Sequence, residues 1–458
     1  MRALLLFLSF ALFVSGCASN SITVPTTAQM LDYNQSVLER YQIEDQWWTV
    51  YNDPQLNYLL ETALVNNIDL AIAAIDINKA LYQANVLGAD LVPEFSGGLD
   101  ASISRSIKSG NNTIQDFSGK LGVSYEVDLW RRLADTVSAQ EWELKATIED
   151  RETARLALIN SVVDAYYNLA YLDNAIAVTR ASIDHYRQIK ELTTIKYDNG
   201  KVDMVEPAQA TQSMLSTENN LLGLQNQYKN AQMVMRNLLN FRPEDELDII
   251  APNLKEMVLP PVDLNVPLSV LANRPDLRAS EYRLHSALDS LKATEKSLFP
   301  SITIGATFSS ASEKARTAFD LPFTGGSISI NLPFLQWNRI KWEIKISQAE
   351  YESLLLEFEQ NINTALNELD YYYYNYLNTR ATLAKTEEKH LYDLQISAYY
   401  KIRYDVGANE LSDWLDALNT AISSEINALN YRYQLIQQEN MIYKAMAGRY
   451  AATASATP

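Results

Sequence analysis

The sequence contains one pattern twice, at a constant offset along the chain. Leu91-Val92-Pro93 returns as Leu298-Phe299-Pro300, which starts 207 residues later (298 − 91). Tyr197-Asp198 with Gly200 returns at the same offset as Tyr404-Asp405 with Gly407. This period is far longer than the roughly 20 to 50 residues of a solenoid repeat. We therefore expect two copies of one structural half, placed side by side in a pseudosymmetric assembly.

The offset divides the 458-residue chain into predicted segments that differ in composition. They are a lipoprotein signal peptide (1–16), an N-terminal anchor and equatorial segment (17–66), repeat 1 (67–240), a linker and equatorial segment (241–273), repeat 2 (274–447) and a C-terminal tail (448–458). Each repeat is predicted to contain a β-hairpin followed by a helical hairpin, at about 95–127 and 131–240 in repeat 1, and at about 301–333 and 337–447 in repeat 2.

The helical hairpins are predicted from long stretches without helix breakers. Residues 123–199 contain neither Gly nor Pro, and the same holds for residues 334–406. Apolar side chains within the first stretch recur at steps of three and four, the spacing of a coiled-coil seam, at Leu156, Ile159, Val163, Tyr166 and Ala170. A glycine follows each stretch, as expected for a left-handed helix cap before a return helix at about 205–240 or 410–447.

Period-two alternation predicts two β-hairpins, one in each repeat. Apolar residues alternate with small or polar residues (Ser, Gly, Asp, Lys and Glu) over 95–104 and 117–127, and a similar pattern covers 301–308 and 327–332. The polar segments 105–116 and 309–324 are expected to be the hairpin loops. Four strands are too few to close a membrane barrel, which needs about eight or more. Two chains would supply eight strands and three would supply twelve, and the small polar residues of one face favour the trimer with a water-filled lumen.

The N-terminus reads as a targeting segment rather than as part of the fold. Residues 3–14 are apolar, and Val14-Ser15-Gly16-Cys17 resembles the box at which bacterial lipoproteins are cleaved and lipidated. Cys17 is the only cysteine, so an internal disulfide is excluded, and Ala18 after it favours the outer membrane. A signal peptide that merely contains a cysteine is the alternative. After this segment no stretch reaches about 18 apolar residues, so a membrane span would have to be a β-barrel.

Charge and site patterns exclude several functional classes. The chain carries 56 acidic and 38 basic residues, a net charge of −18, which argues against nucleic-acid binding. Its three histidines, His185, His285 and His390, lie apart on predicted helices and lack metal-ligand spacing. No phosphate-binding glycine loop or nucleophile elbow is present. We therefore expect neither an enzyme nor a cofactor.

Several short motifs together resemble the outer-membrane efflux proteins of the TolC and OprM type, over nearly the whole mature chain. They are Trp47-Trp48, Asn52-Asp53-Pro54, Tyr125–Trp130, Asn273–Leu277, Leu298–Ser301 and Arg403–Gly407 through Leu415-Asp416-Ala417. The resemblance implies an α+β membrane protein, a homotrimer whose twelve-stranded β-barrel, four strands per chain, continues into a long α-helical barrel in the periplasm. It also implies a periplasmic membrane-fusion adaptor and an inner-membrane pump of the proton-driven RND type. The lipidation box places the chain in the outer membrane, anchored through Cys17 in the lipid bilayer and nearer the OprM branch.

The same resemblance points to a gate at the tip of the second helical hairpin. Asp413 and Asp416 lie on one face of the predicted return helix, where the family carries an acidic ring at the periplasmic aperture. Tyr404 matches a position that holds this aperture shut. Asn409 replaces the arginine of the TolC latch, so that a salt bridge from this position is not expected. A solvated helix face is the alternative reading of the two aspartates.

The function expected from these observations is an exit duct that conducts drugs or other small toxic solutes passively to the exterior. One alternative is the outer-membrane duct of a type I protein secretion system. Another is a lipid-anchored periplasmic coiled-coil spacer without a pore, against which the strand alternation argues. The transported substrate is not readable from this chain, because the pump and adaptor usually select it.

Overall fold

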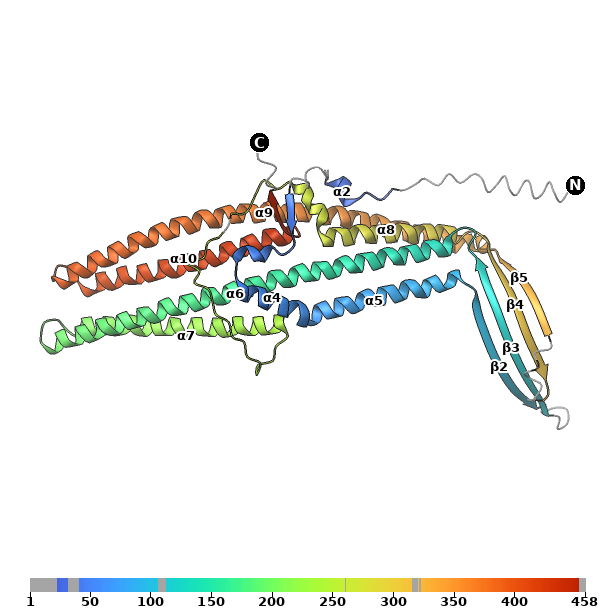
Figure 1. The fold of residues 1–458 in the computed structure, drawn as a ribbon, viewed down its shortest axis with the longest axis horizontal. Coiled ribbons are helices and arrows are strands. Elements are labelled where there is room, and N and C mark those ends of the chain that lie inside the picture. Colours follow the sequence, from blue (N-terminus) through green and yellow to red (C-terminus); the bar gives the residue numbers. More distant parts are fainter. Residues whose placement is uncertain are drawn as a thin grey trace.

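The computed structural model describes residues 23–31, 41–105, 113–259, 261–314, 320 and 323–452. Within this part, the chain forms a long rod of helices with a curved β-sheet at one end (Figure 1). The signal peptide and Cys17, which the sequence analysis singled out, lie outside the described residues.

Four helices of two lengths make up the rod. They are α6 (Arg132–Asp198), α7 (Val205–Leu239), α9 (Trp337–Asp405) and α10 (Leu411–Ala445). The 67 residues of α6 extend over about 100 Å, at about 1.5 Å per residue. The predicted seam from Leu156 to Ala170 is buried at each of its apolar positions. The helices lie side by side in the order α9, α10, α6, α7, so that the two hairpins join through α10 and α6 (Figure 1).

Each hairpin turns at a glycine with a positive φ. Gly200 has φ 67° and Gly407 has φ 73°, a region that residues with a Cβ rarely adopt. At each turn the next amide also bonds back to the helix, from Lys201 N to Lys196 O and from Ala408 N to Arg403 O. This is the backbone pattern of a Schellman helix end, and it confirms the predicted caps.

The four predicted strands form one antiparallel sheet in the order β2-β3-β4-β5. Their bounds are Glu94–Arg105 for β2, Thr113–Val127 for β3, Ser301–Ser312 for β4 and Phe323–Asn331 for β5. The central β3–β4 pairing joins the two repeats, with Gly122 opposite Thr307. The expected loops 105–116 and 309–324 were too wide, because hydrogen-bonded pairing continues into their polar ends.

Shorter elements connect the sheet with the rod. Helix α5 packs on α6, and helix α8 packs on both α6 and α9. A second sheet, formed by strands near the two ends of the described chain, was not predicted. The bounds are α2 (Thr27–Met30), β1 (Tyr41–Glu44), η1 (Trp47–Tyr51), α4 (Pro54–Asn66), α5 (Ile68–Gly88), η2 (Ala89–Leu91), η3 (Leu268–Asn273), α8 (Pro275–Lys296), η5 (Pro333–Gln336) and β6 (Arg449–Ala452).

The linker between the repeats crosses three helices of the rod. The Asn174 amide of α6 donates to Pro252 O at 3.1 Å, and Arg432 of α10 donates to Leu254 O at 3.0 Å. Farther along, the backbone N–H of Val262 donates to the Tyr376 hydroxyl of α9 at 3.2 Å. The linker therefore bonds both helical hairpins near the middle of the rod.

In the described part of the chain, none of the helices taken singly meets the length and hydropathy needed to cross a membrane. One bent pair, Pro54–Asn66 with Ile68–Leu91, meets both requirements when its two segments are combined across a 43° bend.

Candidate functional site: the tips of the helical hairpins

The turns of the two helical hairpins are held together by a small apolar cluster. This tip cluster consists of Tyr186, Ile189, Ala210, Tyr404, Leu411, Trp414 and Leu415, all of them buried. It draws side chains from α6, α7, α9 and α10, so that burial of its apolar surface favours the two tips staying in contact. The cluster is separate from the larger core that surrounds the middle of the rod.

Tyr404 provides a polar link between the two hairpins. Its hydroxyl donates a hydrogen bond of 2.7 Å to Glu206 Oε2 on the first turn of α7. The ring lies 5.7 Å from that of Trp414, and the Lys196 ammonium sits 4.2 Å from its centroid. Burial and the neighbouring Glu206 carboxylate raise the pKa of Tyr404, so that the hydroxyl keeps its proton and remains a donor.

A second polar link connects the two inner helices of the same tips, α6 and α10. The Tyr186 hydroxyl of α6 donates to Asn419 Oδ1 of α10 at 2.5 Å. Burial raises the pKa of Tyr186, and the charge of Asp416 adds to this effect. Both links join the first hairpin to the second within a single chain. Separating the tips therefore requires breaking two hydrogen bonds and exposing the tip cluster.

The predicted aspartates occupy different environments on α10. Asp413 is half-buried and accepts a hydrogen bond of 2.7 Å from the Asn409 amide. Asp416 is exposed and lies close enough to Tyr186 to affect its titration. The structure thus brings Asn409 and Asp413 into one hydrogen-bonded unit and leaves Asp416 beside it.

Arg403 completes this unit, and the sequence analysis did not single it out as a site residue. Its guanidinium donates to Asn409 Oδ1 and, at 3.0 Å, to the Tyr399 hydroxyl. Asn409 therefore lies between Arg403 and Asp413 and is hydrogen-bonded to both of them. The sequence could have indicated Arg403, because it precedes Tyr404 in one of the motifs that carry the family resemblance. Tyr186, Lys196 and Asn419 were also missed, since their partners are distant in sequence.

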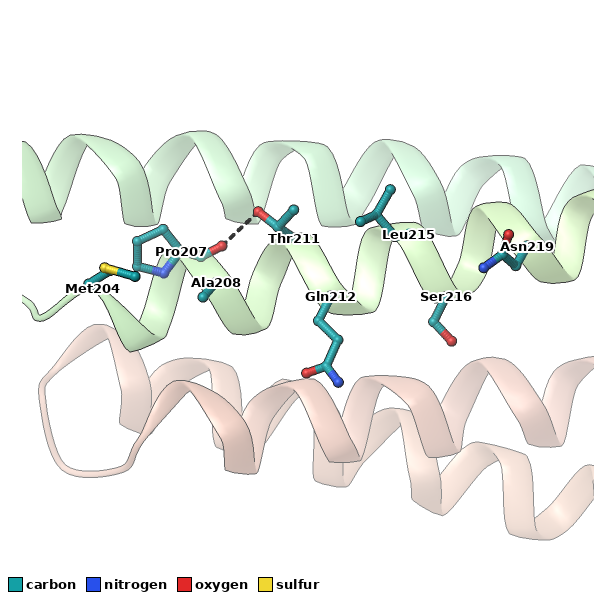
Figure 2. Close-up of a pocket in the computed structure, with 8 residues that line it drawn as sticks. All are labelled: Met204, Pro207, Ala208, Thr211, Gln212, Leu215, Ser216 and Asn219. Carbon is teal, nitrogen blue, oxygen red and sulfur yellow. Dashed lines mark hydrogen bonds between the residues drawn. The ribbon is translucent and has the colours of Figure 1, made fainter.

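A groove runs along α7 next to the tips. Its volume is about 700 Å³, and Met204, Pro207, Thr211 and Leu215 are among its lining residues (Figure 2). Figure 2 shows these side chains on a single face of α7, with the second hairpin alongside. Met204 and Leu215 are exposed in the single chain. Within the described residues, no group of His, Cys, Asp or Glu side chains has an arrangement suited to a metal ion.

The chain matches the model of the family described as outer membrane efflux protein at residues 59–240 and 266–448. The two matched segments correspond to the two repeats and cover most of the chain. This chain belongs to the outer membrane efflux protein family. It is an outer-membrane exit channel for efflux, and channels of this family are trimers that work with a periplasmic adaptor and an inner-membrane pump.

Two curated relatives match the chain over almost its full length. An uncharacterized protein of Haemophilus influenzae is 44% identical, with 97% of this chain and 98% of the relative covered. Toxin and drug export protein A of Aggregatibacter actinomycetemcomitans is 41% identical, with 98% and 99% covered. A more distant relative, cation efflux system protein CusC of Escherichia coli K12, is 24% identical over 88% of each chain.

Solved outer-membrane channels share the fold. The CusC structure superposes with a TM-score of 0.82 at 21% identity, and covers 89% of this chain and 96% of its own. VceC of Vibrio cholerae has a TM-score of 0.79 at 22% identity, with 89% and 100% covered. The expected fold class is confirmed: the chain combines long helical hairpins with a four-stranded antiparallel sheet.

Proposed function

We propose that three copies of this chain close a twelve-stranded β-barrel and a continuous helical tunnel. The described sheet supports this proposal because β2 and β5 are its edge strands, and both are exposed along their whole length. Unpaired edges on a sheet are a template for pairing with another strand. Pairing β2 of one chain with β5 of the next adds four strands per chain and leaves no open edge once the ring is closed.

The duct would carry small toxic solutes from an adaptor and an RND-type pump to the exterior. The observation that favours this cargo is the relative with 41% identity, whose name includes drug export. The same name includes toxin export, which favours protein secretion as a second candidate. The non-pore spacer is disfavoured, because a spacer has no use for a sheet with one small, polar face.

Deleting the gene distinguishes the two cargoes. The deletion strain is challenged with dyes, detergents, antibiotics and metal salts, and the proteins in its culture medium are profiled in parallel. Sensitivity that the wild-type gene reverses supports solute efflux. A protein missing from the medium with unchanged tolerance supports secretion, and sensitivity that the gene does not reverse contradicts the assignment.

The hairpin tips would form the gate of this duct. The hydrogen bond from Tyr404 to Glu206 joins the two hairpins within each chain. The hydrogen bond from Asn409 orients Asp413 on the same face of α10 as Asp416. Three chains would gather six carboxylates from Asp413 and Asp416, an arrangement that attracts cations and repels anions. Arg403 donates to Asn409 and Asn409 donates to Asp413, all within the second hairpin, so this relay of hydrogen bonds would fix the position of Asp413 in the gate without a direct salt bridge.

Replacing both aspartates tests the gate. The double variant Asp413→Ala with Asp416→Ala should raise the resting conductance of the purified protein in a planar bilayer and weaken block by divalent cations. Glu359→Ala with Glu388→Ala, at exposed positions of α9 away from the tips, is the control for the loss of two negative charges. If the double variant has the same resting conductance and the same cation block as the wild type, the two aspartates are not part of the gate.

Two further contacts with the cell are part of this proposal. Cys17 would carry the lipid anchor, which incorporation of labelled palmitate into wild type and its loss in Cys17→Ala would test. The α7 groove beside the tips would receive the adaptor, because its exposed apolar residues Met204 and Leu215 alternate with small ones such as Ala208. A helix of the adaptor can approach such a surface closely.

A further inference from the structure

A second groove lies at the middle of the rod, away from the hairpin tips. Its floor is α6 and its walls are α7 and α10, and its volume is about 640 Å³. Polar lining residues include Asn160, Asp164, Asn168, Gln227 and Asn230. The volume falls within the roughly 300 to 1,000 Å³ that is typical of small-molecule sites.

The groove opens on the side of the helical layer opposite α4. At about 100° per residue, Tyr166 lies on the far side of α6 from Asp164. The Tyr166 hydroxyl bonds Asp53 at 2.7 Å, at the start of α4, so α4 covers that far side. On the near side, α7 and α10 both flank α6, and Met441 of α10 completes the lining. If α4 and the linker lie outside the tunnel, the groove faces its lumen.

The chemistry of the lining selects one class of ligand. Half of the lining is polar, with four side-chain amides, and the other half is apolar, with residues such as Leu172, Val234 and Leu238. Asp164 is the one charged residue of the lining, and no Lys, Arg or His takes part. A negative charge beside amides and an apolar wall suits an organic cation with an apolar body.

An unpaired donor in the groove points to a ligand as well. Asn160 is buried, and its Nδ2 has no hydrogen-bond partner among the described residues. A buried amide N–H without an acceptor is costly, so that such a group is normally paired with a ligand or a water. Asn160 also lines the groove, so a ligand bound there could supply the acceptor if the enclosed amide turns toward it.

Hydrogen bonds from α10 hold the floor of the groove rigid. The Tyr433 hydroxyl donates to Asp164 Oδ1 at 2.9 Å, and the Gln437 amide donates to the same oxygen at 2.8 Å. The Asn440 amide donates to the backbone oxygen of Asn160 at 3.0 Å. All these donors are neutral, so they fix the position of the Asp164 carboxylate without placing a positive charge beside it.

We propose that this groove binds an amphiphilic organic cation on its way through the duct. The cation would lie near Asp164, its apolar body against Leu238 and Val234, and an acceptor atom would take the free N–H of Asn160. This proposal rests on the proposed function, because the groove meets transported solutes only if the rod is a conducting tunnel.

Fluorescence anisotropy with rhodamine 6G tests the site on the full-length protein, purified in a nonionic detergent. Rhodamine 6G has a fixed positive charge, apolar rings and an ester acceptor, and fluorescein supplies the same ring framework as an anion. Saturable binding of rhodamine 6G, with none of fluorescein, is expected. Asp164→Asn should weaken it about tenfold, which corresponds to about 1.4 kcal/mol of binding free energy, because the contact between opposite charges is lost.

Two further variants distinguish a loss of binding from a loss of folding. Asn230→Trp fills the groove from an exposed position on α7, leaves the Asp164 bonds in place, and should abolish binding at an unchanged melting temperature. Asp173→Asn removes the same charge from an exposed position of α6 outside the lining, and should bind like wild type. Binding that is unsaturable, or equal in all four proteins, overturns the site.

Planar-bilayer conductance of the same preparations separates this proposal from the duct itself. Conductance without saturable binding means that the groove holds only water, and the duct assignment stands. Saturable binding sensitive to Asp164→Asn, in a protein that never conducts, supports the site and counts against the duct.

Discussion

At the scale of single residues, Glu439 of α10 is a carboxyl group held in the interior of the rod. Its side chain is fully buried, and its Oε2 accepts a hydrogen bond from the Tyr51 hydroxyl at 3.3 Å. Burial raises the pKa of this carboxyl to about 8, and Tyr51, Arg380 and Arg449 lower it by less. At neutral pH the folded protein therefore holds Glu439 in its neutral, protonated form.

This pKa predicts a loss of stability as the pH rises. The unfolded chain ionises Glu439 near its ordinary pKa of 4.5, while the folded chain does so only near 8. The contribution of Glu439 to the free energy of unfolding should therefore be greatest below about pH 4.5. It should decline by at most about 1.4 kcal/mol per pH unit up to pH 8. Thermal melting of wild type and Glu439→Gln across this pH range tests the prediction. An equal dependence of stability on pH in the two proteins would contradict it.

The hydroxyl of Tyr404 makes a second prediction at this scale. Tyr404→Phe keeps the ring against Trp414 and removes only the bond to Glu206, which contributes about 1.5 to 3 kcal/mol when the acceptor is charged. The closed tip should open more often, which single-channel recording would detect as a higher open fraction. Tyr400→Phe, one turn earlier on α9, is the control. Equal open fractions in Tyr404→Phe and the control would show that the hydroxyl does not hold the tip.

At the scale of elements, the linker between the repeats acts as a tie across both helical hairpins. Asn174 of α6 bonds it twice, by donating to Pro252 O at 3.1 Å and by accepting from Leu254 N at 3.2 Å. Arg432 of α10 donates to Leu254 O on the same stretch and also pairs with Glu387 of α9. The hairpins are thus joined at mid-height as well as at their tips.

Removing the Asn174 amide should loosen this tie. Asn174→Ala leaves Leu254 N and Pro252 O without their partner and should cost about 1 to 3 kcal/mol of local stability. Limited proteolysis should then cut the linker at residues 241–259 faster than in wild type. Gln188→Ala, at an exposed position of the same helix, should leave the cleavage rate unchanged. An unaltered rate in Asn174→Ala would mean that other contacts hold the linker.

The elements themselves were predictable to different degrees. The long helices follow from local signals, because an absence of breakers and a seam at steps of three and four need no tertiary contact. The loops of the β-hairpins were placed too wide, since Thr113 and Ser312 pair through backbone groups that carry no sequence signal. The strand at Arg449–Ala452 was missed for the same reason, as its partner lies at Tyr41–Glu44. The segment limits assigned from the repeat stay a prediction.

At the scale of the whole molecule, the open edges of the sheet determine what a single chain lacks. Strands β2 and β5 each pair on one side only within the described sheet, although both carry apolar side chains such as Phe95, Leu99 and Ile328 at exposed positions. Exposed apolar strands with open edges are an aggregation hazard in water. They are stable where lipid covers the apolar face and a neighbouring chain covers each edge.

Disulfide trapping tests this arrangement between chains. A cysteine at Ser102 of β2 is combined with cysteines introduced one at a time at residues 325–331 of β5, and membranes are oxidised and run on a non-reducing gel. At one register we expect covalent dimers and trimers. Ser102 combined with a cysteine at Ser310 of the central strand β4 should give none. Failure at every register would exclude pairing of these edges.

The sequence alone determined the duplication, the helix lengths, the strand alternation and the family, because each is written in local spacing or in short motifs. It also pointed to Tyr404, Asp413 and Asp416. Only the tertiary structure decided which residues complete the tips, since Tyr404 meets Glu206 and Tyr186 meets Asn419 across about 200 positions of the chain. The same holds for the groove around Asp164: it exists because α7 and α10 flank α6, an arrangement set by packing between helices that no local pattern encodes.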